Sequence, residues 1–287
     1  MGKIKKAVIA VAGSGTRLLP ATKSMPKEML PIVDKPIIQL VVEELVEGGI
    51  EDIILVTKWD KKPLEDHFDR NWALMEDLRK AGKEKLREEK KKVSELANFI
   101  YIRQKGPYGN GTPVLSAASL INDNEPFVFV WGDDLVKSKV SFTKQMVDEY
   151  EKDGHLMIGV QEVPHETVNR YGVVKLKECT MQIEDIIEKP SVDEAPSNLA
   201  DFGRMILNKE IIEILAKTPL GKDNELYLVD AIRTYVGNGG VFMAKKVEGG
   251  EWLTTGDPLN YLKACIKYAF DRDDIGNDLK EFVKKEL

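Results

Sequence analysis

In the first half of the chain, short apolar runs alternate with segments that have apolar residues at helical spacing. Lys6–Ala12 and Asp52–Thr57 are nearly continuous apolar runs, the pattern of strands buried on both faces of a parallel sheet. Between them, Pro36–Glu47 has the spacing of a helix, and Gly48-Gly49 ends it. This alternation predicts βαβ units and a mostly parallel sheet. It continues with predicted strands at Ile100–Arg103 and Pro126–Trp131 and a short helix at Val114–Leu120.

The pattern changes after about residue 150, where several strands precede the last helices. The chain has no internal repeat and no linker rich in Pro, Gly or Ser. We therefore predict one α/β domain over residues 1–287, in which residues 1–150 form a Rossmann-like sheet flanked by helices and residues 151–287 form an elaboration. The later predicted elements are strands at His155–Val163, Tyr171–Lys177, Gln182–Glu188, Leu199–Leu207 and Val241–Val247, and helices at Lys209–Ala216, Glu225–Val236, Pro258–Phe270 and Asp278–Lys285.

Charge and composition argue against several classes of protein. The formal net charge of −6 is not that of a general nucleic-acid binder. Within Pro63–Leu96, the basic residues from Arg79 to Lys92 alternate with Glu at helical spacing, which favours a solvated helix face. Cys179 and Cys265 form neither a disulfide framework nor a zinc-ligand set, and no apolar run has the length of a membrane span. We therefore expect a cytoplasmic protein with no membrane partner.

A glycine-containing loop follows the first predicted strand. Gly13-Ser14-Gly15 lies at the carboxyl end of this strand, where open α/β sheets bind ligands and where backbone N–H groups can approach a phosphate. Leu18 occupies the place of the third glycine of a Rossmann fingerprint, which argues against a NAD-binding oxidoreductase, and Thr16-Arg17 does not complete a Walker A motif. Basic residues follow, among them Lys23 and Lys27. These residues alone leave open a phosphate-binding loop and an ordinary turn with surface cations.

Two charged motifs follow later strands. Trp131-Gly132-Asp133-Asp134 ends a strongly apolar strand, so we expect the Asp133 carboxylate in the ligand crevice as a Mg²⁺ ligand, although Asp-Asp pairs are also common in turns. Asp134 is expected to have a supporting or structural role. Glu188-Lys189 follows Ile183–Ile187 and by itself would be an exposed pair of opposite charge. None of the three histidines has ligand or catalytic spacing.

Two motifs near the N-terminus carry a resemblance to a known family. Ala12–Arg17 (AGSGTR), followed by Pro26–Pro31 (PKEMLP), resembles the signature of the sugar-1-phosphate nucleotidylyltransferases. The longer form TRLLPATKSMPKEMLPIVDKPIIQ, and the charged insertion that opens with His67-Phe68-Asp69, are similar to the prokaryotic UTP–glucose-1-phosphate uridylyltransferases. The resemblance covers essentially the whole chain. It continues through Arg103-Gln104, Tyr171–Val174, Glu188-Lys189-Pro190, Gly203-Arg204 and Gly256 to Lys263.

The resemblance implies that residues 1–150 bind the nucleotide. The backbone of Ala12-Gly13, the Gln104 side chain and Gly109 are implied to hold the uracil, whose edge requires the donor and acceptor that an amide offers. Arg17 and Lys27 are implied to neutralise the triphosphate, because cations stabilise the charge that develops during phosphoryl transfer. The remaining nucleotide-binding residues implied are Ser14, Gly15 and Thr16.

The resemblance also implies that residues 151–287 bind the sugar and add a helical C-terminal part. Glu188 is implied to accept sugar hydroxyls and Lys189 to pair with the sugar phosphate, while Gly172 and Gly203 let the backbone approach the sugar. Asp230 resembles a family position near the sugar. The catalytic residues implied are Arg17, Lys27, Asp133 and Lys189, with Mg²⁺ on Asp133.

The activity implied is direct, in-line transfer of the uridylyl group of UTP to α-D-glucose 1-phosphate, in a homo-oligomer (dimer or tetramer). Alternatives are the same reaction with dTTP or another hexose 1-phosphate, and a catalytically silent nucleotide-sugar regulator. One position departs from the family pattern, because Thr254 stands where a second acidic metal ligand is usual, two residues before Gly256. Asp257 either supplies the missing charge or caps the helix that begins at Pro258.

Overall fold

The computed structural model describes residues 2–287, and its centre is a nine-stranded sheet. Both halves of the chain contribute strands, so residues 1–150 and 151–287 share one hydrophobic core. The strands, in order across the sheet, are β10 (Ile183–Glu188), β9 (Gly172–Leu176), β11 (Leu199–Leu207), β6 (Phe127–Trp131), β1 (Lys6–Ala10), β4 (Asp52–Thr57) and β5 (Asn98–Arg103), with β8 (Leu156–Glu162) paired to β11 and β12 (Phe242–Lys246) paired to β8.

The four strands of the first half run parallel. β1 pairs with β6 and β4, and β4 pairs with β5, all in parallel. Ile53–Thr57 of β4 are all buried, which explains why the sequence shows a continuous apolar run there. In the second half, β11 runs antiparallel to β6, β8 and β9, whereas β12 runs parallel to β8. The predicted α/β fold with a mostly parallel central sheet is confirmed. Within this nine-stranded sheet, every antiparallel pairing involves a strand that follows residue 150.

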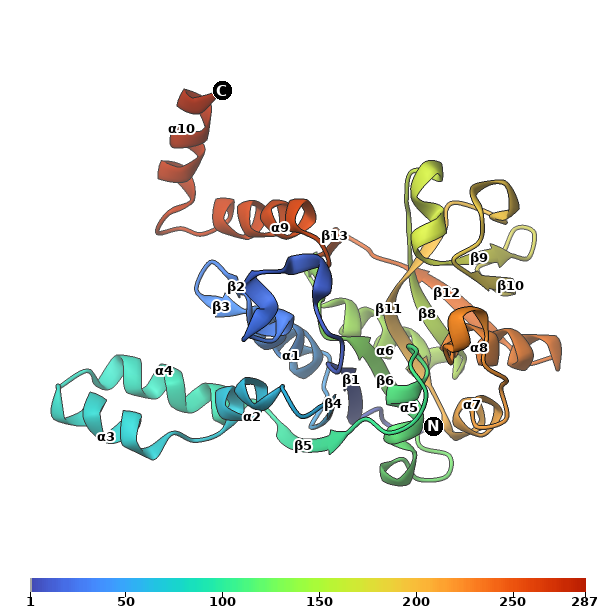
Figure 1. The fold of residues 1–287 in the computed structure, drawn as a ribbon, viewed down its shortest axis with the longest axis horizontal. Coiled ribbons are helices and arrows are strands. Elements are labelled where there is room, and N and C mark those ends of the chain that lie inside the picture. Colours follow the sequence, from blue (N-terminus) through green and yellow to red (C-terminus); the bar gives the residue numbers. More distant parts are fainter. Residues whose placement is uncertain (1) are drawn as a thin grey trace.

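The charged segment after Pro63 forms three helices, α2 (Lys62–Phe68), α3 (Trp72–Lys80) and α4 (Glu84–Ser94). No residue of α4 is buried, which confirms the predicted solvated helix face. α3 and α4 make an arm that projects from the body (Figure 1). Within residues 2–287, no helix has both the length and the apolar character needed to cross a membrane. The remaining helices are α1 (Ile37–Glu47), α5 (Thr112–Ser116), α6 (Phe142–Asp153), α7 (Lys209–Leu215), α8 (Leu228–Gly237), α9 (Pro258–Phe270) and α10 (Gly276–Glu286).

Five elements, α6, β7, β13, β2 and β3, lie outside the patterns predicted from the sequence. α6 has capping signals, because the Ser141 side chain accepts a hydrogen bond from the Lys144 N–H and Gly154 ends the helix in the left-handed conformation. β7 (Asp134–Ser138) and β13 (Gly250–Thr254) instead pair with each other, antiparallel and outside the main sheet. No local signal reveals this pairing, because the partners are far apart in sequence. A further short antiparallel pair joins β2 (Pro31–Ile32) to β3 (Lys35–Pro36).

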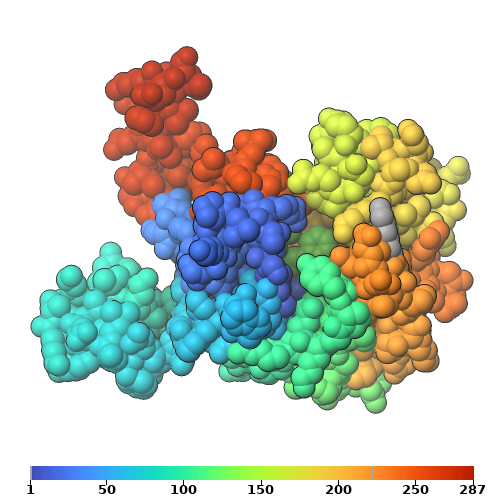
Figure 2. Space-filling model, in the orientation of Figure 1, coloured from blue at the N-terminus to red at the C-terminus, as the bar shows by residue number. Residues whose placement is uncertain are grey.

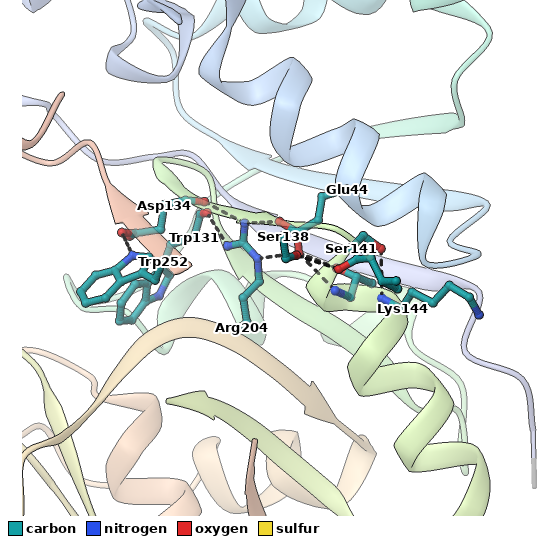
Figure 3. A network of polar contacts seen from close by, with 10 residues as sticks. Glu44, Trp131, Asp134, Ser138, Ser141, Lys144, Arg204 and Trp252 are labelled. Carbon is teal, nitrogen blue, oxygen red and sulfur yellow. Dashed lines mark hydrogen bonds and ion pairs between the residues drawn. The ribbon is translucent and has the colours of Figure 1, made fainter. Parts of the chain in front are cut away.

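A fully buried guanidinium joins three parts of the core. Arg204, on β11, donates from Nη2 to Glu44 Oε2 of α1 at 2.9 Å and to the main-chain oxygen of Asp134 at 2.7 Å. Its Nη1 also donates to the main-chain oxygen of Trp131, at 3.4 Å. Thr143 of α6 donates to the other Glu44 oxygen at 2.9 Å. Figure 3 shows Arg204 between Glu44, Trp131 and Asp134. The hydrogen bonds of Arg204 therefore hold the turn between β6 and β7 against β11 and α1.

We expect loss of the Glu44 carboxylate to destabilise the fold strongly. Glu44→Ala leaves a buried cation without its counter-charge, so the free energy of unfolding should fall by about 3 kcal/mol. Urea denaturation measures this change. Lys144→Ala is the matched control, because it removes the exposed ion pair with Asp148 and should change the same quantity by less than about 0.5 kcal/mol. Equal losses in the two variants would contradict the expectation.

Candidate active site

A cavity opens at the carboxyl ends of β1 and β6, with residues of both halves of the chain in its wall. Its volume is about 370 Å³, and a second hollow of about 370 Å³, lined by residues 13–18, adjoins it. In Figure 2 the N-terminal segment, in blue, lies near the middle of the view, and the yellow part of the second half lies to its right. Of the residues predicted for the site, the main cavity is lined by Ala12, Gly13, Arg17, Lys27, Gln104, Gly109, Asp133 and Lys189, and the adjoining hollow by Ser14, Gly15 and Thr16.

The glycine-containing loop folds tightly against Lys27. Gly15 has a φ of 65°, the left-handed conformation that favours glycine. A Cβ atom on Gly15 would lie 3.2 Å from Lys27 Cβ, and one on Gly13 would lie 3.3 Å from Lys27 Cε. Thr22 fixes the loop by donating from Oγ1 to the Gly15 carbonyl oxygen at 2.7 Å. The two glycines thus let the lysine side chain lie along the loop into the cavity.

Lys27 and Asp133 form the central ion pair of the cavity. Lys27 Nζ lies 2.5 Å from Asp133 Oδ2, and both side chains are largely buried. Burial alone lowers the pKa of Lys27, but the charges of Asp133 and Glu28 outweigh this effect and raise the pKa. Burial likewise disfavours ionised Asp133, yet Lys27, and more weakly Arg17, hold its pKa below the ordinary value. Both groups are therefore charged at neutral pH.

The neighbouring Asp134 has a different environment. Its Oδ1 accepts a hydrogen bond from the Trp252 indole N–H at 2.7 Å (Figure 3). Burial, followed by the charge of Asp133, raises the pKa of Asp134 to about 7. The main-chain oxygen of Asp133 accepts from Thr255 Oγ1 at 2.6 Å, which ties the turn to the end of β13. Only the first of the two aspartates thus combines a low pKa with a lysine partner.

Thr254, which stands where an acidic residue was expected, lies close to the turn that carries Asp133 and Asp134. Thr254 lines the cavity and pairs with Asp134 in the register of β7 and β13. Asp257 caps α9, since its Oδ1 accepts from the Asn260 N–H at 3.1 Å, which confirms the capping interpretation. Its Oδ2 also lies 3.1 Å from Arg170 Nη2. Within residues 2–287, no three His, Cys, Asp or Glu side chains gather as a ready metal site.

In the second half of the chain, Glu188 ends β10 and Lys189 follows it. Lys189 has a φ of 43°, an unusual conformation for a residue with a side chain, and its Nζ lies 5.3 Å from the centre of the Tyr227 ring. Glu188 Oε2 is buried and makes no hydrogen bond among the described residues. Burial above all, together with the charge of Asp230, raises the pKa of Glu188 to about 7 although Lys189 opposes the shift. An unpartnered buried oxygen beside a strained lysine is typical of a binding site.

Glu188, Gly172 and Gly203 are not among the residues that line the main cavity. Glu188 instead lines a neighbouring hollow together with Lys189. A Cβ atom on Gly172 would lie 3.4 Å from Glu188 Oε2, so this glycine leaves room beside the carboxylate. A Cβ atom on Gly203 would lie 2.1 Å from the Trp131 ring, so this glycine allows the indole to pack on the strand. The two glycines therefore shape the walls behind the cavity.

The structure adds side chains to the cavity that sequence reasoning did not single out. Arg170 comes directly before the Tyr171-Gly172 motif and brings a fourth cation. Tyr108 is 66 % exposed and lies in the glycine-rich loop between Gly106 and Gly109, where an aromatic residue between glycines was the only available signal. The other additions to the lining are Asn110, Pro113, Trp131, Glu225, Tyr227 and Trp252.

Comparison with known proteins agrees with this geometry. The model of the nucleotidyl transferase family matches residues 6–270. A UTP–glucose-1-phosphate uridylyltransferase of Staphylococcus epidermidis is 45 % identical, over 99 % of both chains. Among solved structures, a UTP-bound UGPase from Acinetobacter baumannii has a TM-score of 0.88 at 36 % identity, over 98 % of both chains. A UDP-glucose pyrophosphorylase complexed with UDP-glucose has a TM-score of 0.83 at 40 % identity, over 94 % of this chain and 100 % of the other. The chain therefore belongs to the nucleotidyl transferase family, among the UTP–glucose-1-phosphate uridylyltransferases.

Proposed function

We propose that this chain transfers the uridylyl group of UTP to α-D-glucose 1-phosphate and releases UDP-glucose and pyrophosphate. The observation that carries the proposal is one cavity lined by the Lys27–Asp133 pair from the first half of the chain and by Lys189 from the second half. The names of the relatives supply the identity of the substrates. Such a cavity brings two phosphate-bearing molecules into contact and surrounds them with cations.

The nucleotide would lie against the first half of the chain. The backbone of Ala12-Gly13 and the amide of Gln104 would hold the uracil, with Gly109 beside it, and all of them line the cavity. Arg17 and Lys27 belong to the cavity and to the hollow beside residues 13–18, which suits a triphosphate that extends from one into the other. Their charges would neutralise the pyrophosphate as it leaves.

The sugar phosphate would approach from the second half. Lys189 would pair with the phosphate of the sugar phosphate. The unpartnered oxygen of Glu188 would accept hydrogen bonds from hydroxyl groups of the sugar. A phosphomonoester has a second pKa of about 6, so the acceptor is mostly a dianion at neutral pH and needs no general base. One of its oxygens attacks the α-phosphorus in line, and the bond to the β-phosphate breaks. The side chains of the cavity position the two anions and screen their repulsion.

A divalent metal, most simply Mg²⁺, fits the residues present. Mg²⁺ binds through one or two carboxylates and completes its shell with phosphate oxygens and waters. Asp133 offers one charged carboxylate in the cavity, and Thr254 offers at most a neutral hydroxyl. Bound there, the metal would supply further neutralisation of the phosphates. The homo-oligomeric state, the single domain and the cytoplasmic location stay predictions.

Activity on a grid of substrates tests the function. We expect pyrophosphate release to be fastest with UTP and glucose 1-phosphate when UTP, dTTP, ATP and GTP are combined with several hexose 1-phosphates. A faster reaction with dTTP or with another hexose 1-phosphate would correct the substrates and leave the chemistry in place. Binding of UDP-glucose without any turnover would instead identify a silent nucleotide-sugar regulator.

Removal of the Lys27 ammonium should affect the chemical step. We expect Lys27→Ala to lower kcat by at least ~100-fold, because one preorganised charge next to the transferring phosphate is lost. Lys23→Ala is the matched control, since Lys23 lies in the same loop region but is exposed and lines neither hollow. Steady-state kinetics with both variants, checked for folding by circular dichroism, measures the effect. Near-normal turnover of folded Lys27→Ala would remove Lys27 from the mechanism.

The two aspartates near the turn should respond differently to neutralisation. We expect Asp133→Asn to abolish turnover, because it removes the charged carboxylate proposed to hold the metal. Asp257→Asn should lower the free energy of unfolding by about 1 kcal/mol or less through the weakened helix cap, with little change in kcat. Activity as a function of Mg²⁺ concentration, together with melting temperatures, separates the two effects. A large rise in the Mg²⁺ requirement of Asp257→Asn, with an unchanged melting temperature, would make Asp257 a metal ligand.

A further inference from the structure

A second ion pair lies directly behind the cavity and has no role in the function proposed so far. Lys61 Nζ lies 2.7 Å from Glu28 Oε2, and the two side chains are only 3 % and 0 % exposed. Placing two charges in the interior carries a large desolvation cost, which their attraction does not always offset. Such a pair is weak evidence for added stability. Its position relative to the active site therefore becomes the informative observation.

The buried pair lies next to the Lys27–Asp133 pair. Glu28 follows Lys27 in the chain, and its Cγ would lie 3.4 Å from a Cβ atom on Gly132, the residue before Asp133. The charge of Glu28 helps to raise the pKa of Lys27, and the charge of Lys61 helps to lower that of Asp133. The site and the interior behind it therefore hold two neighbouring ion pairs, Lys61–Glu28 at 2.7 Å and Lys27–Asp133 at 2.5 Å, which are joined through the adjacent residues Lys27 and Glu28.

The segment that carries Lys61 also contacts the phosphate loop. Lys61 directly precedes α2, and three residues earlier Lys58 Nζ donates to Ser14 Oγ at 2.9 Å. The segment that leads into α2 therefore contacts the site twice, once at the glycine-containing loop through Lys58 and once at Glu28 through Lys61. Glu28 Oε1 is buried and makes no hydrogen bond among the described residues, so Lys61 is the donor that holds this carboxylate.

We propose that Lys61 and Glu28 are positioning residues, which hold the Lys27 ammonium in the place where it meets Asp133 and the phosphates. The inference rests on the proposed function, since Lys27 must act on phosphates for its placement to matter. Lys61 fixes the Glu28 carboxylate, and the fixed carboxylate in turn sets the backbone and the electrostatic surroundings of Lys27. Displacement of a catalytic group by about 1 Å can lower a rate by about 100-fold, so a pair that touches no substrate is able to affect turnover.

The test compares the same substitution at two partly or fully buried lysines. Lys61→Met should lower kcat by about 10- to 100-fold while the KM for UTP and the calorimetric Kd for UTP change by less than about threefold. Lys6→Met is the matched control, because Lys6 pairs with Glu125 at 3.0 Å at the amino end of β1, away from the cavity. It should lower the melting temperature but leave kcat within about twofold. Lys61→Arg, which keeps the charge, should recover most of the lost turnover.

A double-mutant cycle separates positioning from a general loss of stability. In a Lys27→Ala background, Lys61→Met should lower kcat by less than about threefold, because it acts through a side chain that is already gone. A full 10-fold loss in that background would overturn the proposal, and so would normal turnover of folded Lys61→Met. If Lys61→Met does not fold, Glu28→Gln replaces it in the same cycle, since it keeps the shape of the side chain. Absence of activity in the unaltered protein would contradict the proposed function, whereas an active protein with unaffected variants contradicts only this inference.

Discussion

The buried guanidinium of Arg204 is the constraint on which the arrangement of the site depends. A charged group without access to water must have its N–H donors satisfied by fixed partners. Arg204 finds them in Glu44 and in the main-chain oxygens of Trp131 and Asp134. Because the guanidinium is planar and rigid, it sets the distance between the end of β6 and the start of β7. Asp133 lies between these two carbonyls, so its carboxylate has a defined position at the edge of the sheet.

The same turn separates two adjacent aspartates into different electrostatic states. Asp133 lies against Lys27 and remains ionised, whereas burial and the charge of Asp133 raise the pKa of Asp134 to about 7. Asp134 accepts the indole N–H of Trp252, which fastens the turn to β13. At neutral pH the turn therefore carries one fully charged carboxylate, on Asp133, and a second, on Asp134, that is only partly ionised. Two like charges so close together disfavour each other's ionisation, and the charge of Lys27 beside Asp133 decides which of them stays charged.

The two halves of the chain contribute different parts to one charge distribution. The first half brings Arg17 and Lys27 on a loop whose glycines allow close approach, and the second half brings Lys189 and Arg170. Lys189 reaches the cavity through an uncommon positive φ, and Arg170 is held by Asp257 at the start of α9. Strain of this kind persists only where surrounding structure imposes it. Cations from both halves of the chain therefore line one cavity, as the proposal of two anionic substrates requires.

The sequence by itself determined the parallel strands of the first half and the glycine-containing loop, and it gave the cap at Asp257 as one of two interpretations. Each of these follows from neighbouring residues: apolar runs, the freedom of glycine, and an Asp before a Pro at the start of a helix. The motifs also indicated Lys27 and Asp133 as members of one site. Only the tertiary structure decided the pairing of β7 with β13, the cavity position of Arg170, and the Lys61–Glu28 pair behind Lys27. These depend on contacts between residues far apart in the chain, where burial and charge are set by the folded surroundings and no local pattern records the partner.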